Sequence, residues 1–217
     1  MDLEKNIIII YVPRSGSTNL MNSFNDTHIC LNEPFSVKVG DTFEDFLNLV
    51  ENGDKPIVLK TGTDHVPKDF NPHNHEVSGP WQNELNDPTL DDEDKWLDFF
   101  DLLLPYFKTI ILLDRKDYDD HLIAWNHLVS RIKIGMNPHE KYDVIENLKG
   151  DFHYYFDRSK ERLKIISKKL NKQIDYYEDI YYGDTQKFIE SLGFEFTKNM
   201  KKVLNTSNRY RRKINEL

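Results

Sequence analysis

The chain has 217 residues, one cysteine and a formal net charge of −8 at pH 7. These values exclude a disulfide-stabilised domain and argue against a general nucleic-acid-binding protein. The length suits a single domain over residues 1–217. The start is polar and the first apolar run is short, so we expect no signal peptide, no membrane anchor and a cytoplasmic location.

The first apolar run, IIIIYV at residues 7–12, is short and rich in β-branched residues, which predicts a buried strand. A helical pattern follows over 18–24, so the expected order is strand, polar loop, helix. A glycine permits close backbone approach, hydroxyls and an arginine add donors, and a helix N-terminus favours anions. The stretch therefore predicts a phosphate-binding loop. Its candidate residues are Arg14, Ser15, Gly16, Ser17 and Thr18.

Neither common nucleotide motif is present in this loop. It has one glycine and no Gly-Lys pair, so it is not G-x-x-x-x-G-K-[ST], and it is not G-x-G-x-x-G. An ordinary strand-to-helix turn with a surface arginine remains the alternative at this point.

The remaining chain alternates between strand and helix patterns. We expect 31–40 to be irregular and 64–88 to form a long surface loop. Alternation of this kind predicts an α/β fold of three layers, with a central, mostly parallel sheet flanked by helices. The further strands are predicted at 57–61, 109–114 and 174–180, and the further helices at 41–50, after Thr89, at 117–134, at 142–170 and from Thr185.

Basic residues stand at the ends of three predicted strands. Arg14 follows the first, Lys60 ends the second, and Arg115 and Lys116 follow the third. Ligands of parallel sheets bind beyond the carboxyl ends of the strands. The coincidence favours an anionic ligand.

The C-terminal segment, 198–217, is basic, with seven lysines and arginines against one glutamate. A solvated helix face, a nucleic-acid arm and part of an anion site all remain open as interpretations. Elsewhere, the cluster His73-Asn74-His75-Glu76 lacks the spacing of a helical H-E-x-x-H site and no cysteine joins it. We therefore expect no bound metal.

The stretch YVPRSGSTNL at 11–20 resembles the P-[RK]-[ST]-G-[ST]-T loop of sulfotransferases that use 3′-phosphoadenosine 5′-phosphosulfate (PAPS). ILLDRKDYDDHLIAW at 111–125 is similar to the segment in which their arginine, and a serine eight residues later, bind the 3′-phosphate. YYEDIYYGDTQKFIESLGFEF at 176–196 and KKVLNTSNRYRRKINEL at 201–217 resemble two later elements, in the same order. The expected serine is missing, because Ile123 and Ala124 stand eight residues after Arg115 and Lys116.

The resemblance implies a P-loop-like mononucleotide-binding fold, PAPS as sulfuryl donor and no required metal. The acceptor would carry a hydroxyl group, as a sugar or glycolipid does. The loop would hold the 5′-phosphosulfate and Arg115 or Lys116 the 3′-phosphate. The element that closes over the nucleotide would supply Arg209, Tyr210, Arg211 and Arg212.

The resemblance also suggests catalytic roles. Arg14 and the loop amides would stabilise the leaving oxygen, and Lys60, in K-T-G where the family has K-T-H, would reach the sulfuryl group. Gly62 replaces the family's histidine. Glu33, in Asn-Glu-Pro-Phe, matches the element of carbohydrate-type members and is the preferred base, with His65 in reserve.

Two other functions remain open from the sequence. One is a nucleotide-binding protein with a degenerate site and no transfer activity, and the other is a small-molecule or nucleotide kinase. Neither the acceptor nor an oligomeric state is indicated by any residue pattern.

Overall fold

A computed structural model describes residues 3–36, 39–67, 70, 93–133 and 153–211. Within these ranges the strands form one parallel sheet in the order β2-β3-β1-β4-β5. The expectation of an α/β fold around a parallel sheet is thus confirmed. The strands are β1 (Ile7–Tyr11), β2 (Ile29–Asn32), β3 (Ile57–Gly62), β4 (Thr109–Asp114) and β5 (Asp175–Tyr176).

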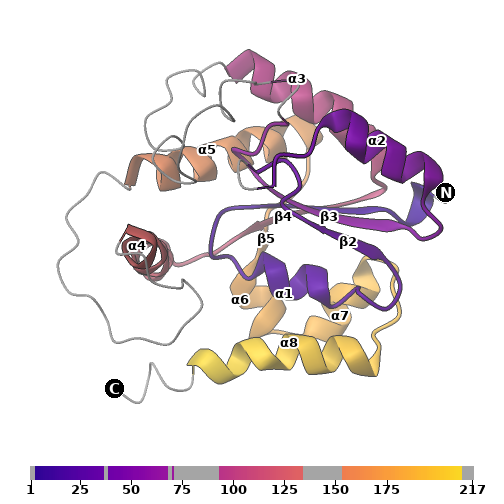
Figure 1. Cartoon of the computed structure of the whole chain (residues 1–217). Helices are drawn as coiled ribbons and strands as arrows, with labels where there is room; N and C mark the ends of the chain where they lie inside the picture. Colours follow the sequence, from indigo (N-terminus) through magenta and orange to yellow (C-terminus); the bar gives the residue numbers. More distant parts are fainter. Residues whose placement is uncertain (1–2, 37–38, 68–69, 71–92, 134–152, 212–217) are drawn as a thin grey trace.

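Helices cover both faces of the sheet (Figure 1). Helices α2, α3 and α5 lie on one face, and α1, α6, α7 and α8 lie on the other. None of the helices in the described ranges is long and apolar enough to cross a membrane. The helices are α1 (Ser17–Asn22), α2 (Phe43–Asn52), α3 (Glu93–Leu103), α4 (Tyr118–Lys133), α5 (His153–Leu170), α6 (Tyr177–Tyr181), α7 (Thr185–Ser191) and α8 (Lys198–Arg211), with short 3₁₀ turns at η1 (Leu3–Lys5) and η4 (Leu104–Tyr106).

Strand β1 is the centre of the core. It pairs with β3 on one side and β4 on the other, and its four isoleucines are fully buried. Ile8 and Ile10 join the apolar cluster under α2, α3 and α5, whereas Ile7 and Ile9 join the cluster under α1, α6, α7 and α8. Successive side chains of a strand point to opposite faces, so a strand buried on both faces needs an unbroken apolar run.

The expectations for the two edge strands are wrong. Leu31 and Asn32 belong to β2, not to an irregular stretch, because this edge strand is only four residues long and half-buried, without a clear apolar pattern. The strand expected over 174–180 contains only Asp175–Tyr176, and α6 begins at Tyr177. Tyr177, Ile180 and Tyr181 are buried together, which is the spacing of one helix face.

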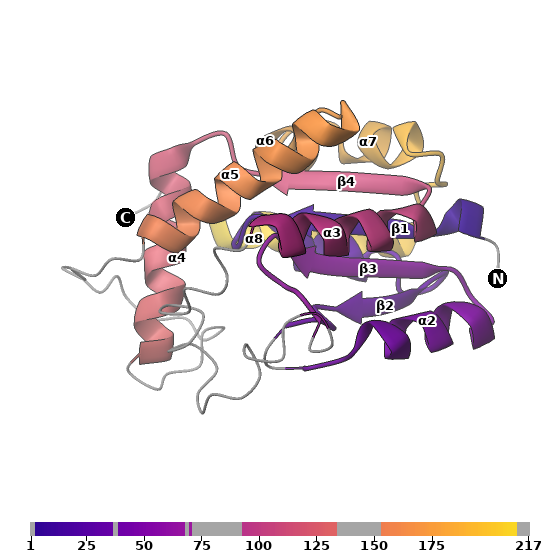
Figure 2. The same cartoon turned by 90° about the horizontal axis from the view of Figure 1, so that it is seen from above.

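Because the strands are parallel, their carboxyl ends share one edge of the sheet. Figure 2 shows the arrowheads of β2, β3 and β4 directed toward the same side, where α4 lies. The β1–α1 loop, the end of β3 and the start of α4 are therefore assembled at this edge.

Candidate functional site

The β1–α1 loop, residues 12–16, turns sharply out of the sheet. The Ser15 amide donates to the Val12 carbonyl oxygen at 3.3 Å, and Arg14, with φ of 70°, has left-handed backbone. The amides of Asn19 and Leu20 make the first helical bonds, both to the Gly16 oxygen. The amides of Gly16, Ser17 and Thr18 precede these bonds, so they can serve an anion.

Ser15 has a buried hydroxyl group without a hydrogen-bond partner among the described residues. Its side chain is fully buried. Leaving a buried hydroxyl unpaired costs about 1–3 kcal/mol. A ligand oxygen at the loop would remove this cost.

Gly16 is required by its surroundings as well as by its backbone. Its φ is 82°, and a Cβ added there would lie 2.7 Å from the Tyr177 ring and 3.0 Å from the Tyr181 ring. The Tyr181 hydroxyl donates to the Gly16 oxygen at 2.7 Å. Helix α6 therefore packs directly against the loop, and only glycine permits this approach.

Lys60 reaches the first turn of α1, next to the loop, from the end of β3. Its side chain is 4% exposed, and Nζ lies 2.8 Å from Thr18 Oγ1, 2.9 Å from Asn32 Oδ1 and 2.6 Å from Glu33 Oε1. Burial lowers the pKa of Lys60, and the Glu33 carboxylate opposes that shift. The structure therefore brings together two predicted features, the lysine and the loop.

Glu33 is an ion-pair partner in this structure. It has a φ of 54°, contacts Lys60, and accepts a short hydrogen bond from the Tyr11 hydroxyl. Burial alone would raise its pKa, but His65, Lys60 and Tyr11 together lower it to about 2. A carboxylate with so low a pKa is a weak general base at neutral pH.

The ring of His65, the reserve base, accepts a hydrogen bond from the backbone of Gly62. The Gly62 amide donates to His65 Nδ1 at 3.1 Å, so in the neutral ring the proton is on Nε2. Burial lowers the pKa of His65, which favours the neutral ring. Its basic lone pair is thus already engaged.

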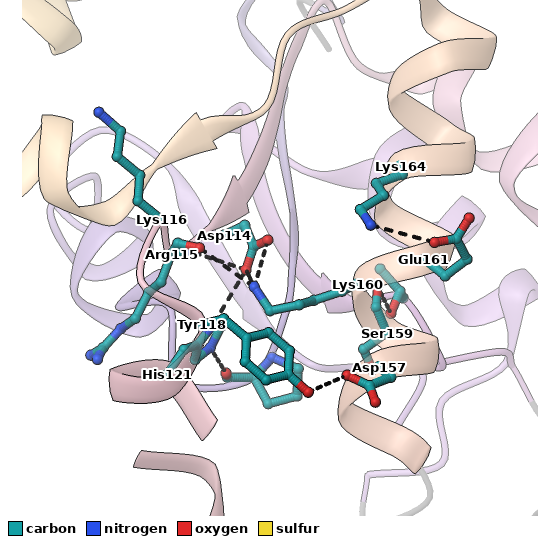
Figure 3. Close-up of polar contacts among 12 residues, drawn as sticks. Asp114, Arg115, Lys116, Tyr118, His121, Asp157, Ser159, Lys160, Glu161 and Lys164 are labelled. Carbon is teal, nitrogen blue, oxygen red and sulfur yellow. Dashed lines mark hydrogen bonds and ion pairs between the residues drawn. The ribbon is translucent and has the colours of Figure 1, made fainter. Parts of the chain in front are cut away.

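The two basic residues after β4 have different surroundings. The Arg115 guanidinium lies 4.6 Å from the centre of the Tyr177 ring, and this ring packs on Gly16, so Arg115 is linked to the loop through Tyr177. Lys116 is exposed and pairs with Asp179 at 2.5 Å, which raises its pKa. In Figure 3 both side chains point away from Asp114.

Sequence reasoning missed a buried polar cluster behind the loop. Asp114 at the end of β4 accepts from Lys160 Nζ at 2.7 and 2.9 Å, and His121 of α4 lies between Asp114 and the loop (Figure 3). These residues are far apart in the chain, and in the sequence each one, taken alone, looks like a polar residue on the surface. The aspartate at the end of β4 was the only signal available.

A second missed cluster lies at the end of β3. Asp64 accepts from Arg162 Nη1 at 2.7 Å and from Ser159 Oγ at 2.6 Å. Helix α5 thus neutralises a carboxylate after β3 and, through Lys160, another at the end of β4. These contacts hold α5 across the carboxyl edge of the sheet.

Several predicted residues lie outside what the structure describes. Side chains at the end of α8, which include Arg209, Tyr210 and Arg211, are not described, and neither are Arg212 and the cluster at 73–76. Within the described ranges there is no group of three or more residues suited to a metal. A surface hollow lined by Phe70, Asp98, Asp101 and Leu102 involves none of the predicted site residues.

Comparisons with protein-family models, with curated proteins and with solved structures found no match for this chain.

Proposed function

We propose that the chain has a P-loop-like fold and is a sulfotransferase that moves the sulfuryl group of PAPS to a hydroxyl acceptor. The observation that carries the proposal is the 2.8 Å contact between Lys60 Nζ and Thr18 Oγ1. It places a buried ammonium group at the first turn of α1, directly after the β1–α1 loop. The buried, unpaired Ser15 hydroxyl supports the same site.

The sheet order supports the P-loop-like assignment. From β1 the chain goes to the edge strand β2, returns to β3 beside β1, and then crosses to β4 and β5 on the other side of β1. The loop after β1 therefore lies where the topology changes direction, which is where open parallel sheets bind ligands.

In the proposed reaction the acceptor oxygen attacks sulfur, a new O–S bond forms, and the bond from sulfur to the phosphate oxygen breaks. The electron pair goes to that bridging oxygen, and the acceptor loses its proton. Arg14, Lys60 and the amides of residues 16–18 would stabilise the negative charge on the departing nucleotide. Positioning and charge stabilisation supply most of the catalysis in transfers of this kind.

Glu33 would take the acceptor proton after the donor has bound. The donor's anionic oxygens compete with Glu33 for the Lys60 ammonium. Loss of that ion pair raises the pKa of Glu33 from its present value of about 2 and makes it a stronger base. We expect the same carboxylate to be an ion-pair partner without donor and a base with donor.

Two observations favour a second function, nucleotide binding without transfer. Neither Glu33 nor His65 presents a strong base in this structure, and no serine occupies position 123 or 124. A kinase is less well supported, because the buried lysine comes from β3 and not from the loop itself.

The first test is calorimetric titration with 3′,5′-adenosine bisphosphate (PAP), beside AMP and Mg-ATP. Micromolar PAP binding that is lost in Arg14→Ala and Lys60→Met would support the donor site. Lys108→Met is the control, because Lys108 is exposed and pairs only with Glu4 across 3.2 Å among the contacts described.

Radiolabelled PAPS with a panel of glycan acceptors then tests transfer. Sulfated product would support the enzyme, and PAP binding without product from any acceptor would favour the non-catalytic function. Tight Mg-ATP binding would favour a kinase. No PAP binding would refute the proposal.

A further inference from the structure

His121 makes a contact with the loop that no part of the proposed chemistry uses. The residue is fully buried on α4, and its Nε2 lies 2.5 Å from the carbonyl oxygen of Pro13. A carbonyl can only accept, so Nε2 carries the proton and donates. The contact joins two segments separated by 108 positions in the chain.

The Pro13 carbonyl belongs to a turn with two alternative forms. Val12, Pro13, Arg14 and Ser15 form a β-turn closed by the Ser15 amide on the Val12 oxygen at 3.3 Å. Proline at the second position suits both type I and type II turns. Arg14 at the third position has a φ of 70°, which is the type II form and normally favours glycine.

Types I and II differ by rotation of the central peptide, here the one between Pro13 and Arg14. Rotation from type II to type I turns the Pro13 oxygen and the Arg14 amide to opposite sides of the turn. It also changes φ of Arg14 from positive to negative. For a non-glycine residue the left-handed form is strained. Something outside the turn must therefore favour type II, and a donor aimed at the Pro13 oxygen does so directly.

The Phe156 ring packs against His121, meeting the imidazole edge-on at 4.7 Å between centres. Nδ1 makes no hydrogen bond among the described residues and lies 3.3 Å from Asp114 Oδ1, a carboxylate that Lys160 binds from α5. Burial, helped by the Lys160 charge, lowers the pKa of His121 against the pull of Asp114. The neutral ring with its proton on Nε2 already makes the required bond.

We propose that His121 is a positioning residue that holds the Pro13–Arg14 peptide in the type II orientation and thereby sets the shape of the β1–α1 loop. His121 lies between the loop and Asp114, which directly precedes Arg115 at the end of β4. The link between His121 and the turn stands on geometry alone. Its effect on ligand binding rests on the proposed function.

The first experiment uses the ligand-free protein and nuclear Overhauser contacts in solution. A type II turn brings Hα of Pro13 close to the amide proton of Arg14, and a type I turn separates them. We expect a strong contact in the wild type, a weak one in His121→Phe, and restoration in His121→Gln, whose side-chain amide can still donate to Pro13. His28→Phe is the control, since His28 is also buried and contacts a backbone oxygen, that of Lys5 at 3.1 Å, away from the loop.

A double-mutant cycle gives a second, independent readout. His121→Phe should lower the free energy of unfolding less in the wild type than in Arg14→Gly. Once the donor is gone, the Arg14 turn relieves its strain by rotating to type I, whereas the glycine turn stays in type II without strain and loses the whole hydrogen bond. Packing changes caused by phenylalanine occur in both backgrounds and cancel. Equal losses in the two backgrounds, or a type II turn that persists in His121→Phe, would overturn the inference.

Binding of PAP then tests the consequence for the site. We expect His121→Phe to bind PAP roughly tenfold more weakly, which is the effect of one lost hydrogen bond. His121→Gln should bind PAP nearly as tightly as the wild type. If the wild type does not bind PAP, the proposed function fails while the turn measurement still decides the role of His121. If both variants bind PAP as tightly as the wild type does, His121 does not shape the site.

Discussion

The Tyr181 hydroxyl donates a hydrogen bond to the backbone oxygen of Gly16, 2.7 Å away, and so joins α6 to the β1–α1 loop. Burial raises the pKa of Tyr181, which keeps the hydroxyl protonated as a donor. The same oxygen also accepts from the amides of Asn19 and Leu20, so it keeps partners when the tyrosine is removed.

We therefore expect Tyr181→Phe to lower the free energy of unfolding by only about 0.5–1 kcal/mol, near the lower end for a buried hydrogen bond. Urea unfolding followed by circular dichroism measures the loss. Tyr106→Phe is the control and should change stability by less than about 0.5 kcal/mol, since no bond from its hydroxyl is recorded in the described residues. A loss of unfolding free energy above about 2 kcal/mol in Tyr181→Phe would mean that the hydroxyl stabilises more than its bond to the Gly16 oxygen.

Gly16→Ala tests the close packing of α6 on the loop. The new methyl group would meet the Tyr177 and Tyr181 rings at 2.7 and 3.0 Å, and φ of 82° is unfavourable for alanine. We expect a loss of about 2–4 kcal/mol, together with loss of PAP binding.

Gly193→Ala is a matched control for that change. Gly193 has a φ of 86°, and a Cβ there would have nothing within 4 Å. Only the backbone cost of about 1 kcal/mol should remain. Equal losses at the two positions would contradict the packing of the tyrosine rings against Gly16.

Glu33→Gln tests the ion pair with Lys60 through its dependence on pH. The pKa of Glu33 falls from 4.5 to about 2 on folding, so the unfolded chain binds more protons between these values. Stability from this carboxylate is complete above pH 4.5 and is lost as the pH falls toward 2. With allowance for partial exposure to solvent, we expect about 1–2 kcal/mol.

The measurement is the free energy of unfolding as a function of pH. Between pH 4.5 and about 2 the wild type should lose more stability than Glu33→Gln. Other carboxylates titrate there too, so the difference between the two profiles is the quantity of interest. Glu161→Gln is the control, because its pair with Lys164 is exposed to solvent. Parallel profiles for the wild type and Glu33→Gln would contradict the ion pair.

The strands that the sequence predicted well are those buried on both faces. The predicted bounds of β4, 109–114, match the structure, and β3 extends one residue past the expected 57–61. β2 and β5 lie at the edges of the sheet, where burial is partial and the apolar pattern is weak. Their pairing depends on neighbours distant in the chain, which local patterns do not report.

The same division applies to the candidate site. The loop residues are contiguous, so their glycine, hydroxyls and arginine form a visible pattern. The residues that shape the loop are His121, Tyr177 and Tyr181, and they lie more than a hundred positions away in the chain. Their roles depend on the parallel packing of β4, α4 and α6 around β1, which only the fold reveals.

Lys160→Met tests the buried cluster that supports His121. Lys160 donates to both carboxylate oxygens of Asp114, which is only 7% exposed. Removing Lys160 would leave this buried carboxylate without its cation. We expect a loss of about 2–4 kcal/mol in urea unfolding. Lys164→Met lies one turn further along α5, in an exposed pair with Glu161 at 3.5 Å, and should cost less than about 0.5 kcal/mol.

The same variant should change the titration of His121. Burial is the main cause of the lowered pKa of His121, and the nearby Lys160 charge lowers it further, so its removal leaves Asp114 free to stabilise the imidazolium. The pKa of His121 should rise in Lys160→Met and stay unchanged in Lys164→Met, as followed by NMR of the imidazole nitrogens. A rise with no loss of stability would mean that a protonated His121 has replaced Lys160 as the partner of Asp114. If neither the stability nor the pKa of His121 changes in Lys160→Met, then Lys160 and Asp114 do not pair in solution.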